Sequence, residues 1–340
     1  MRILVTGSAG FIGFHVARRL LANGHEVLGL DGMTPYYDVR LKEARHAILK
    51  AHEGFSEHVL SLEDEPAFSG LFDDRPPRAI IHLAAQAGVR YSLENPRAYI
   101  DSNLVGTFNV MELARRCEVE HLMVASTSSV YGASVIAPFS EIDRADHPLT
   151  LYAATKKAGE EMTHAYSHLW RIPTTVLRFF TVYGPWGRPD MALFRFARAI
   201  AGGEAIEVYN HGDMKRDFTY IDDLVEGIVR LMGKIPSDRS SAPVTRDSLS
   251  PVAPWRVVNL GRGEPVGLLD FIREIERSLG RRAELKMLPM QPGDAHLTFA
   301  DVGLLEALTG YRPATSVAAG VAAFCDWFKT SHGLAPGAAP

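Results

Sequence analysis

Two side chains one helical turn apart could together remove a proton from an alcohol. Tyr152 and Lys156 stand in the run Y-A-A-T-K, and residues four apart on a helix share a face. A free tyrosine titrates near pH 10, so a base that works near neutrality needs a pKa lower by roughly three units. We expect Lys156, beside a cationic ring in a water-poor cleft, to supply much of that decrease by charge attraction. Y-x-x-x-K also occurs in ordinary amphipathic helices, so this prediction depends on a cofactor site elsewhere in the chain.

The beginning of the sequence has the pattern of a dinucleotide site. The apolar run Ile3 to Val5 predicts a buried strand that leads directly into T-G-S-A-G-F-I-G, where glycines allow a sharp turn and a close approach of pyrophosphate to a helix N-terminus. A second strand ends in Asp31, whose carboxylate would accept hydrogen bonds from ribose hydroxyls, so Asp31 favours NAD over NADP. An aspartate that merely closes a strand is the alternative. The glycines of the motif are Gly7, Gly10 and Gly13.

The elements that must position these residues alternate along the chain. Apolar runs flanked by helical patterns predict an α/β fold with a doubly wound parallel sheet, Rossmann-like in its first part. The Ser- and Pro-rich stretch 236–254 suits a mobile loop, and residues 331–340 suit a disordered tail. The predicted strands are 2–6, 26–30, 79–83, 121–126 and 174–179, and the clearest helices are 11–23 and 103–116.

Composition excludes several classes of protein. The chain has 340 residues, of which 46% are hydrophobic, enough for a large core. A formal net charge of -4 gives no reason to expect nucleic acid or an anionic membrane as a partner. Cys117 and Cys325 are too isolated for a disulfide framework, and the histidines show no metal-ligand spacing, so we expect no metal. No apolar stretch approaches membrane-spanning length and the chain begins with a strand, so we expect a cytoplasmic protein.

Together these motifs resemble the extended short-chain dehydrogenases/reductases that act on nucleotide sugars. Within that family the sequence is most similar to UDP-glucuronate 4-epimerases. The resemblance runs from Met1 to about Lys329 and implies a tightly bound NAD that is recycled in each turnover and a UDP-sugar substrate. The runs that carry it are A-A-Q-A-G-V-R-Y-S at 84–92, N-P-R-A-Y-I-D-S-N at 95–103, R-F-F-T-V-Y-G-P-W-G-R-P-D-M-A at 178–192 and M-K-R-D-F-T-Y at 214–220.

The resemblance implies a catalytic set of Thr127, Tyr152 and Lys156. Thr127, in V-A-S-T-S-S-V-Y-G, matches the position that hydrogen-bonds the reacting sugar oxygen, although backbone capping is a frequent role for such a hydroxyl. The family's 4,6-dehydratases carry an acidic pair after this threonine, whereas Ser128 and Ser129 follow it here, so dehydration is disfavoured. The implied reaction oxidises C4, turns the 4-keto sugar over and reduces it from the other face.

Other positions match sites at the two ends of the substrate. Thr181 and Arg188 match positions associated with a sugar carboxylate, which an arginine fork suits; a solvated loop arginine or a phosphate contact is the alternative for Arg188. Arg90 is a further candidate at the sugar end. For the nucleotide end the resemblance implies Arg216 at the diphosphate and Asp294 near the uridine ribose. The groups around Val208, Tyr209 and Asn210 are expected to border the uracil pocket; a turn with a purely structural role is the alternative for them.

The resemblance also implies a cofactor site and a division into lobes. Two positions depart from the family pattern: Ser61, in a third strand read as V-L-S-L-E-D, replaces a usual aspartate near adenine, and Phe14 replaces a small residue. Residues 1–180 are expected to form the NAD domain with a chain return around 206–235, and residues 181–205 and 236–330 the UDP-sugar lobe. The implied NAD contacts are Gly7, Gly10, Phe11, Ile12, Gly13, Asp31, Leu83, Ala84, Ala85, Tyr152 and Lys156.

Three functions stay open on the sequence alone. A 4-epimerase must restrain the β-keto acid formed at C4, whereas a UDP-glucuronate decarboxylase would let CO2 leave; another UDP-sugar 4-epimerase is a variant of the first. A scaffold that keeps the fold without turnover is the third. The resemblance further suggests a homodimer joined by helices near 97–116 and 152–168.

Overall fold

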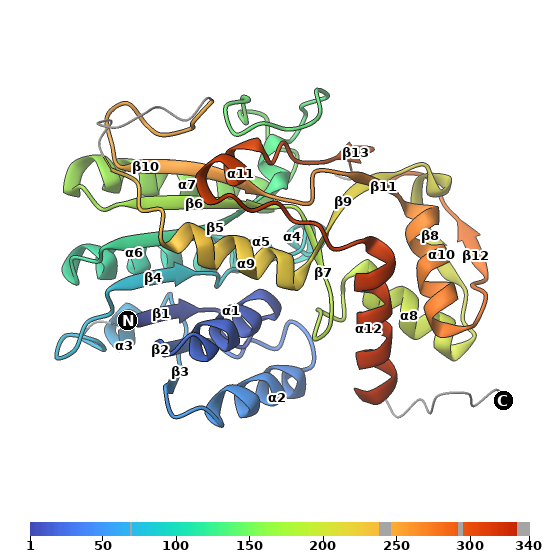
Figure 1. The fold of residues 1–340 in the computed structure, drawn as a ribbon, viewed down its shortest axis with the longest axis horizontal. Coiled ribbons are helices and arrows are strands. Elements are labelled where there is room, and N and C mark those ends of the chain that lie inside the picture. Colours follow the sequence, from blue (N-terminus) through green and yellow to red (C-terminus); the bar gives the residue numbers. More distant parts are fainter. Residues whose placement is uncertain (69, 238–245, 292–294, 332–340) are drawn as a thin grey trace.

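A seven-stranded parallel sheet forms the centre of the larger lobe in the computed structural model, which describes residues 1–68, 70–237, 246–291 and 295–331. Its strand order is β10-β6-β5-β4-β1-β2-β3, so the chain moves outward from β1 in both directions (Figure 1). This is the doubly wound order of dinucleotide-binding folds. The strands are β1 (Arg2–Thr6), β2 (Glu26–Asp31), β3 (Phe55–Val59), β4 (Ala79–His82), β5 (His121–Thr127), β6 (Thr174–Phe179) and β10 (Trp255–Leu260).

Helices cover both faces of this sheet, and each face has its own apolar core. One core joins alternate residues of β1, such as Ile3 and Val5, to α1, α9 and α11; the other joins Leu4 to α6. Because parallel strands are covered on both sides, they read as continuous apolar runs and not as alternating ones. The helices are α1 (Phe11–Ala22), α2 (Val39–Lys50), α3 (Glu65–Phe68), α4 (Tyr91–Glu94), α5 (Pro96–Ile100), π-helix η1 (Asp101–Val105), α6 (Gly106–Arg116), 3-10 helix η2 (Ser128–Tyr131), α7 (Leu151–Trp170), α9 (Ile221–Met232) and α11 (Gly303–Thr309).

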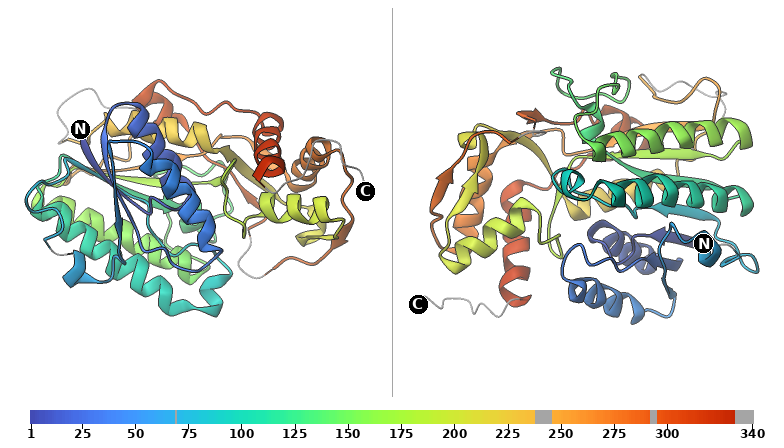
Figure 2. Two further views of the ribbon diagram at one scale, coloured as in Figure 1. Left: turned by 90° about the horizontal axis from the view of Figure 1, so that it is seen from below. Right: turned by 180° about the vertical axis from the view of Figure 1, so that it is seen from behind.

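A smaller lobe lies beyond the carboxyl ends of the large sheet's strands (Figures 1 and 2). Strand β9 is its centre, pairing with β7, β11 and β13, while β8 and β12 form a separate pair. Three helices enclose an aromatic core in which the rings of Phe218 and Phe271 stack 3.9 Å apart. Its elements are β7 (Thr181–Tyr183), α8 (Ala192–Gly202), β8 (Ile206–Val208), 3-10 helix η3 (Tyr209–Gly212), β9 (Lys215–Tyr220), β11 (Pro265–Gly267), α10 (Leu268–Leu279), β12 (Leu285–Met287), β13 (Leu297–Thr298) and α12 (Val317–Ser331).

The predicted α/β class and parallel sheet are confirmed, but two boundaries differ. The third strand is β3, Phe55–Val59, so Ser61 follows the strand instead of standing in it; this edge strand is half exposed and its mixed polarity concealed it. Strand β10 lies in the stretch assigned to the smaller lobe yet pairs with β6 in the large sheet. Of the predicted chain return at 206–235, α9 packs on α1, whereas β8 and β9 belong to the smaller lobe. Of the predicted tail 331–340, residues 332–340 lie outside the described residues, as do residues 238–245 of the predicted loop 236–254. The part 246–254 is anchored and not mobile as predicted, because Arg256 Nε donates to Asp247 Oδ1 at 2.8 Å and His164 Nε2 lies 2.9 Å from Ser250 Oγ.

Candidate active site

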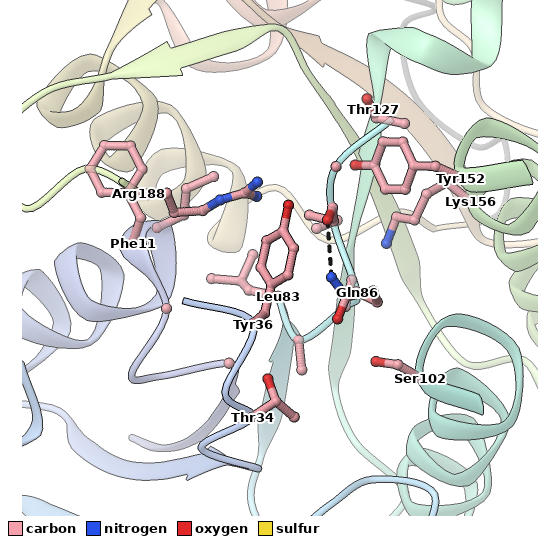
Figure 3. Close-up of a pocket in the computed structure, with 18 of the residues that line it drawn as sticks. Phe11, Thr34, Tyr36, Leu83, Gln86, Ser102, Thr127, Tyr152, Lys156 and Arg188 are labelled. Carbon is pink, nitrogen blue, oxygen red and sulfur yellow. Dashed lines mark hydrogen bonds between the residues drawn. The ribbon is translucent and has the colours of Figure 1, made fainter. Parts of the chain in front are cut away.

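A cavity of about 820 Å³ runs between the lobes, along the carboxyl ends of the central strands. Its size suits a large ligand, since typical ligand pockets measure roughly 300 to 1,000 Å³. Both sets of chemically informative residues line it: the glycine-rich turn after β1, and Tyr152 with Lys156 on α7 (Figure 3). The predicted cofactor residues Gly7, Gly10, Phe11, Ile12, Gly13, Asp31, Leu83, Ala84, Ala85, Tyr152 and Lys156 all contribute to the wall.

The glycine-rich turn is built for close approach. Gly7 has a φ of +74°, and a Cβ on Gly13 would lie 2.0 Å from the Gly7 carbonyl oxygen, so neither position accepts a side chain without distortion. Gly10 stands at the N-cap of α1 without any side-chain cap, which leaves the first N–H groups of the helix to an anion. The turn therefore fits a pyrophosphate.

Asp31 closes β2 and faces the same cavity. Its Oδ2 accepts a hydrogen bond from Ala9 N at 3.1 Å and its Oδ1 one from Met33 N at 2.8 Å. Lys42 Nζ lies 3.6 Å from Oδ1. Asp31 thus closes the strand, as the alternative reading held, and its oxygens, with two lone pairs each, also line the cavity where a ribose would bind. Asp31 and the glycine-rich turn fit NAD.

The catalytic candidates come from two neighbouring elements. Thr150 caps α7 by accepting a hydrogen bond from Ala153 N at 3.2 Å, so Tyr152 lies in the first helical turn and Lys156 one turn later. Thr127 ends β5, and its Oγ1 accepts a hydrogen bond from Ser129 N at 3.2 Å. Thr127 therefore caps η2, as the alternative reading proposed, and also lines the cavity beside Tyr152 (Figure 3).

Burial is the largest influence on the pKa values of Tyr152 and Lys156. Burial raises the pKa of Tyr152, and a hydrogen bond to Thr127 followed by the charge of Arg188 opposes that rise without reversing it. Burial also lowers the pKa of Lys156 to about 8, against the charge of Glu160. The predicted lowering of the tyrosine pKa refers to the site with the cationic nicotinamide ring in place, and it stays a prediction.

A buried ion pair holds α7 against the sheet. Arg178 on β6 makes two hydrogen bonds to Glu160 on α7, at 2.9 and 2.7 Å. Ser126, next to Thr127, donates to the same carboxylate at 2.5 Å. On the other side of α7, Asn103 of η1 donates to Thr155 Oγ1 at 3.1 Å. These contacts fix the helix register that carries the tyrosine and the lysine.

The sugar side of the cavity holds Thr181 and Arg188, both predicted. Thr181 begins β7 and Arg188 follows in the loop before α8. The guanidinium of Arg188 points into the cavity (Figure 3), and it pairs with Asp190, with Nη2 to Oδ2 at 2.5 Å. Arg188 is therefore held by a carboxylate, and it is not the freely solvated loop arginine of the alternative reading.

Four other predicted substrate residues that the structure describes, Arg90, Val208, Tyr209 and Arg216, do not line this cavity. Arg90 lies with its guanidinium carbon 4.4 Å from the ring centre of Tyr209, a cation–π contact that joins the two lobes. Val208 is fully buried in the core of the smaller lobe. Arg216 donates to the carbonyl oxygen of His296 at 3.2 Å. Asp294 lies outside the described residues.

Comparison with known proteins decides the family. The sequence model described as "NAD dependent epimerase/dehydratase family" matches residues 3–242. The chain belongs to this family. Its strand order and glycine-rich turn are therefore those of an epimerase/dehydratase fold, as the sequence resemblance predicted.

Several individual relatives of this chain carry the name UDP-glucuronate 4-epimerase. The epimerase-family chain is 58% identical over 334 residues to a probable UDP-glucuronate 4-epimerase of Rhizobium meliloti (strain 1021), covering 98% of each protein. It is 43% identical to UDP-glucuronate 4-epimerase 3 of Arabidopsis thaliana, covering 96% of this chain and 76% of that one. Among solved structures it resembles the UDP-glucuronic acid 4-epimerase of Bacillus cereus in complex with UDP-glucuronic acid and NAD, with a TM-score of 0.85, 32% identity and coverage of 97% and 100%.

Sequence reasoning missed several residues of the family's cavity in this chain. Tyr36, in the loop after β2, and Gln86, after β4, both line it, and Asp190 anchors Arg188 from outside the lining. The run T-P-Y-Y-D at 34–38, shortly after Asp31, was the available signal for Tyr36. Of the two departures, Ser61 lines the cavity, whereas Phe14 is fully buried and packs 5.5 Å from the ring of Trp186.

The described residues contain neither a metal-ligand cluster nor a membrane-spanning helix. Within the described residues, no cluster of three or more His, Cys, Asp or Glu side chains could hold a metal ion. Over the same part of the chain, no helix combines the length and apolarity needed to cross a membrane. Cys117 is partly exposed and Cys325 buried, and both are free thiols.

Proposed function

We propose that this protein catalyses 4-epimerisation of UDP-glucuronate to UDP-galacturonate. The observation that carries the proposal is a single cavity whose wall combines Tyr152 as the candidate base, a glycine-rich dinucleotide turn and the partly buried Arg188 on the sugar side. The named relatives and the complex with UDP-glucuronic acid and NAD support it. The catalytic roles of Thr127, Tyr152 and Lys156 and the binding roles below are part of this proposal.

NAD fits the first part of the cavity, held by the turn from Gly7 to Gly13, by Asp31 and by the segment from Leu83 to Ala85. Bound there, NAD would supply the acceptor for the C4 hydride and the donor that returns it to the opposite face of the ring. Tyr152 removes the proton of the 4-hydroxyl and later returns one to the new hydroxyl. Thr127 hydrogen-bonds the reacting oxygen, and Lys156 holds positive charge below the tyrosine. General base catalysis of this kind contributes roughly 10² to 10⁴ in rate.

The sugar must turn over between the two half-reactions while the nucleotide stays anchored. Arg216, Tyr209, Val208 and Asp294 are proposed to border the UDP moiety. A loosely held sugar and a tightly held nucleotide divide the binding energy as such a rotation requires. We keep Arg90 as a candidate at the sugar end, and its contact with Tyr209 places both residues at the junction of the lobes.

The carboxylate of the sugar decides between epimerase and decarboxylase. Thr181 and Arg188 are proposed to bind it, because a guanidinium fork and a hydroxyl can fix a carboxylate in one plane. A restrained carboxylate disfavours loss of CO2 from the 4-keto sugar. This arrangement favours the epimerase over the decarboxylase.

The test is incubation of purified protein with UDP-glucuronate without added NAD, followed by separation of sugar nucleotides with mass detection. A new isomeric peak of unchanged mass that matches UDP-galacturonate supports both the activity and a retained cofactor. Loss of CO2 as the main result would identify a decarboxylase. No conversion even with added NAD would refute the proposal. A cytoplasmic location stays a prediction from the sequence.

The proposed assembly is a homodimer joined through α6 and α7. Several large apolar side chains on these helices are exposed, among them Phe108 at 43% and Leu169 at 65%. The rings of Phe108 and Trp170 both contact Tyr166, at 6.4 and 4.5 Å between centres, so they form one face. A clustered apolar face of this kind is typical of a protein–protein contact.

A further inference from the structure

Asp190 binds one edge of the Arg188 guanidinium. Its Nε donates to Asp190 Oδ1 at 3.0 Å and its Nη2 to Oδ2 at 2.5 Å, a bidentate pair in which the two side chains are 20% and 31% exposed. Burial raises the pKa of Asp190, but the hydrogen bonds and charge of Arg188 more than offset this, so its pKa is lowered. The carboxylate therefore stays ionised and keeps its partner fixed.

Tyr36 completes the group from the opposite lobe. Its hydroxyl donates to Asp190 Oδ2 at 3.1 Å, and the guanidinium carbon of Arg188 lies 5.8 Å from its ring centre. Tyr36 itself packs on Tyr91, with 4.7 Å between ring centres. Asp190 is thus held from both lobes, and Arg188 is confined by the aspartate on its edge and by the tyrosine over its plane.

One edge of the guanidinium remains for a second carboxylate. An arginine has five N–H donors, and Asp190 uses Nε and one proton of Nη2. No described residue accepts a hydrogen bond from Nη1, and the guanidinium points into the cavity, near Tyr36 (Figure 3). A second bidentate pair can therefore form on the Nη1–Nη2 edge, in an orientation that Asp190 sets.

We propose that Asp190, steadied by Tyr36, is a positioning residue that fixes the free edge of Arg188 for the substrate carboxylate. This inference rests on the proposed function, because it assumes a uronic acid in the cavity. Its consequence is selectivity for the acidic sugar and suppression of CO2 loss. A carboxylate held in one plane cannot rotate its bond to C5 into alignment with the C4 ketone.

The side reaction that Asp190 prevents is a β-keto acid decarboxylation. The bond between C5 and the carboxylate carbon breaks, its electron pair passes to the C4 carbonyl as an enolate, CO2 leaves and C5 takes a proton from water. The resulting 4-keto pentose is either reduced with the hydride taken from C4 or released while the cofactor stays reduced. Both pentose products lack CO2 and can be counted together.

The experiment compares Asp190→Asn and Tyr36→Phe with the matched control Asp38→Asn. Asp38 also forms a bidentate pair with an arginine two residues away, Arg40, at 2.6 to 3.0 Å, but that pair is exposed and lies off the cavity wall. Asparagine keeps the helix cap that Asp38 provides. The control therefore removes the same charge from the same kind of pair without touching the site.

Two readouts are needed. The first is the ratio of CO2-depleted pentose to UDP-galacturonate, expected to rise about tenfold in Asp190→Asn, less in Tyr36→Phe and not at all in Asp38→Asn. The second is equilibrium binding in a Tyr152→Phe background, where Asp190→Asn should weaken UDP-glucuronate about tenfold and leave UDP-glucose within about twofold. Tyr36→Phe keeps the test available if Asp190→Asn folds poorly.

Other results would overturn the inference. Tighter binding of UDP-glucuronate by Asp190→Asn would mean that Asp190 competes with the substrate for the fork. Parallel losses for both sugars together with a lower melting temperature would mean that the pair only supports the fold. If the unaltered protein forms no UDP-galacturonate, the proposed function fails. The affinities of Asp190→Asn for UDP-glucuronate and UDP-glucose would still show whether Asp190 acts on the substrate carboxylate.

Discussion

At Tyr152, burial and charge work against each other. Burial raises the pKa of the phenol while Thr127 and Arg188 oppose it, and Lys156 is itself made less basic by burial. The side chains alone do not produce a phenolate near neutral pH. In the proposed site, the positive ring of oxidised NAD would supply the missing charge, which would couple the base strength of Tyr152 to cofactor binding.

Tyr152→Phe is the residue-scale prediction. Removal of the hydroxyl takes away the base and leaves the ring's packing against Tyr99, 6.0 Å between centres. We expect turnover of UDP-glucuronate to fall roughly 10² to 10⁴-fold, with substrate binding and melting temperature nearly unchanged. Steady-state kinetics and calorimetric binding measure this. Near-normal turnover would show that another group is the base.

The sequence predicted site residues best where a short local motif indicates their role. The glycine-rich turn, and the pair Tyr152 and Lys156 on one helix, could be singled out because each belongs to a short local motif, and the structure places both in one cavity wall. Tyr36 and Asp190 were missed because they come from loops whose approach to Arg188 depends on how the lobes close. No local pattern encodes that contact.

The turn between β1 and α1 shows how backbone packing shapes the candidate site. Its path depends on backbone packing that admits no Cβ at Gly13. The apolar strand and the glycines were readable in sequence, because both are local. Strand β3 was misplaced and β10 was not foreseen, since an edge strand and a strand after a Ser- and Pro-rich stretch owe their pairing to the rest of the sheet.

Gly13→Ala should abolish the binding of NAD. The new Cβ would lie 2.0 Å from the Gly7 carbonyl oxygen, so the turn must shift, at a cost of about 1–3 kcal/mol. We expect protein purified without NAD and with a lower melting temperature. The control is Gly159→Ala on α7, where the nearest atom is Thr107 Cγ2 at 4.0 Å; it should be neutral or stabilised by up to about 1 kcal/mol. Normal NAD content in Gly13→Ala would contradict this view of the turn.

Glu141 makes the segment between η2 and α7 sensitive to pH. Burial, reinforced by the charge of Asp301, raises its pKa from 4.5 to about 7, although hydrogen bonds such as that from Asn259 N oppose the rise. The folded state therefore holds the proton more tightly than the unfolded state. Its stabilising contribution is full below about pH 4.5 and is lost as the pH rises through about 7.

Glu141→Gln isolates this contribution, because glutamine keeps a carbonyl acceptor for Asn259 and cannot ionise. The free energy of unfolding of the unaltered protein should fall relative to the variant by roughly 3 kcal/mol between pH 4.5 and pH 7. Urea titrations at several pH values give this difference. A difference that is constant with pH, or that grows in the opposite direction, would show that the carboxyl is not titrating in the folded protein.

In the whole molecule, the two lobes together form the candidate site. The cavity lies between the lobes, and the Arg90 contact with Tyr209 spans them. The existence of a second lobe was predicted from sequence, but its boundary was not, because the chain returns to the large sheet at β10. The dimer stays a prediction that rests on the exposed face of α6 and α7.

Phe108→Asp should separate the proposed dimer. A charge at the centre of an apolar contact costs several kcal/mol when it is buried without a partner, so mass measurement at micromolar concentration should shift from dimer to monomer. Val135→Asp is the control, since Val135 is 92% exposed and lies in the loop after η2. A monomeric unaltered protein, or a dimer that survives Phe108→Asp, would refute this interface.

The proposed epimerisation inverts C4 by removal and return of the same hydride within one closed site. UDP-glucuronate carrying deuterium at C4 tests this most directly when it is incubated in ordinary water without added NAD. We expect the UDP-galacturonate formed to retain the deuterium at C4. Tyr152→Phe should form almost no UDP-galacturonate. Product that has exchanged the deuterium for solvent hydrogen would contradict the account, because inversion would then proceed by proton abstraction from carbon.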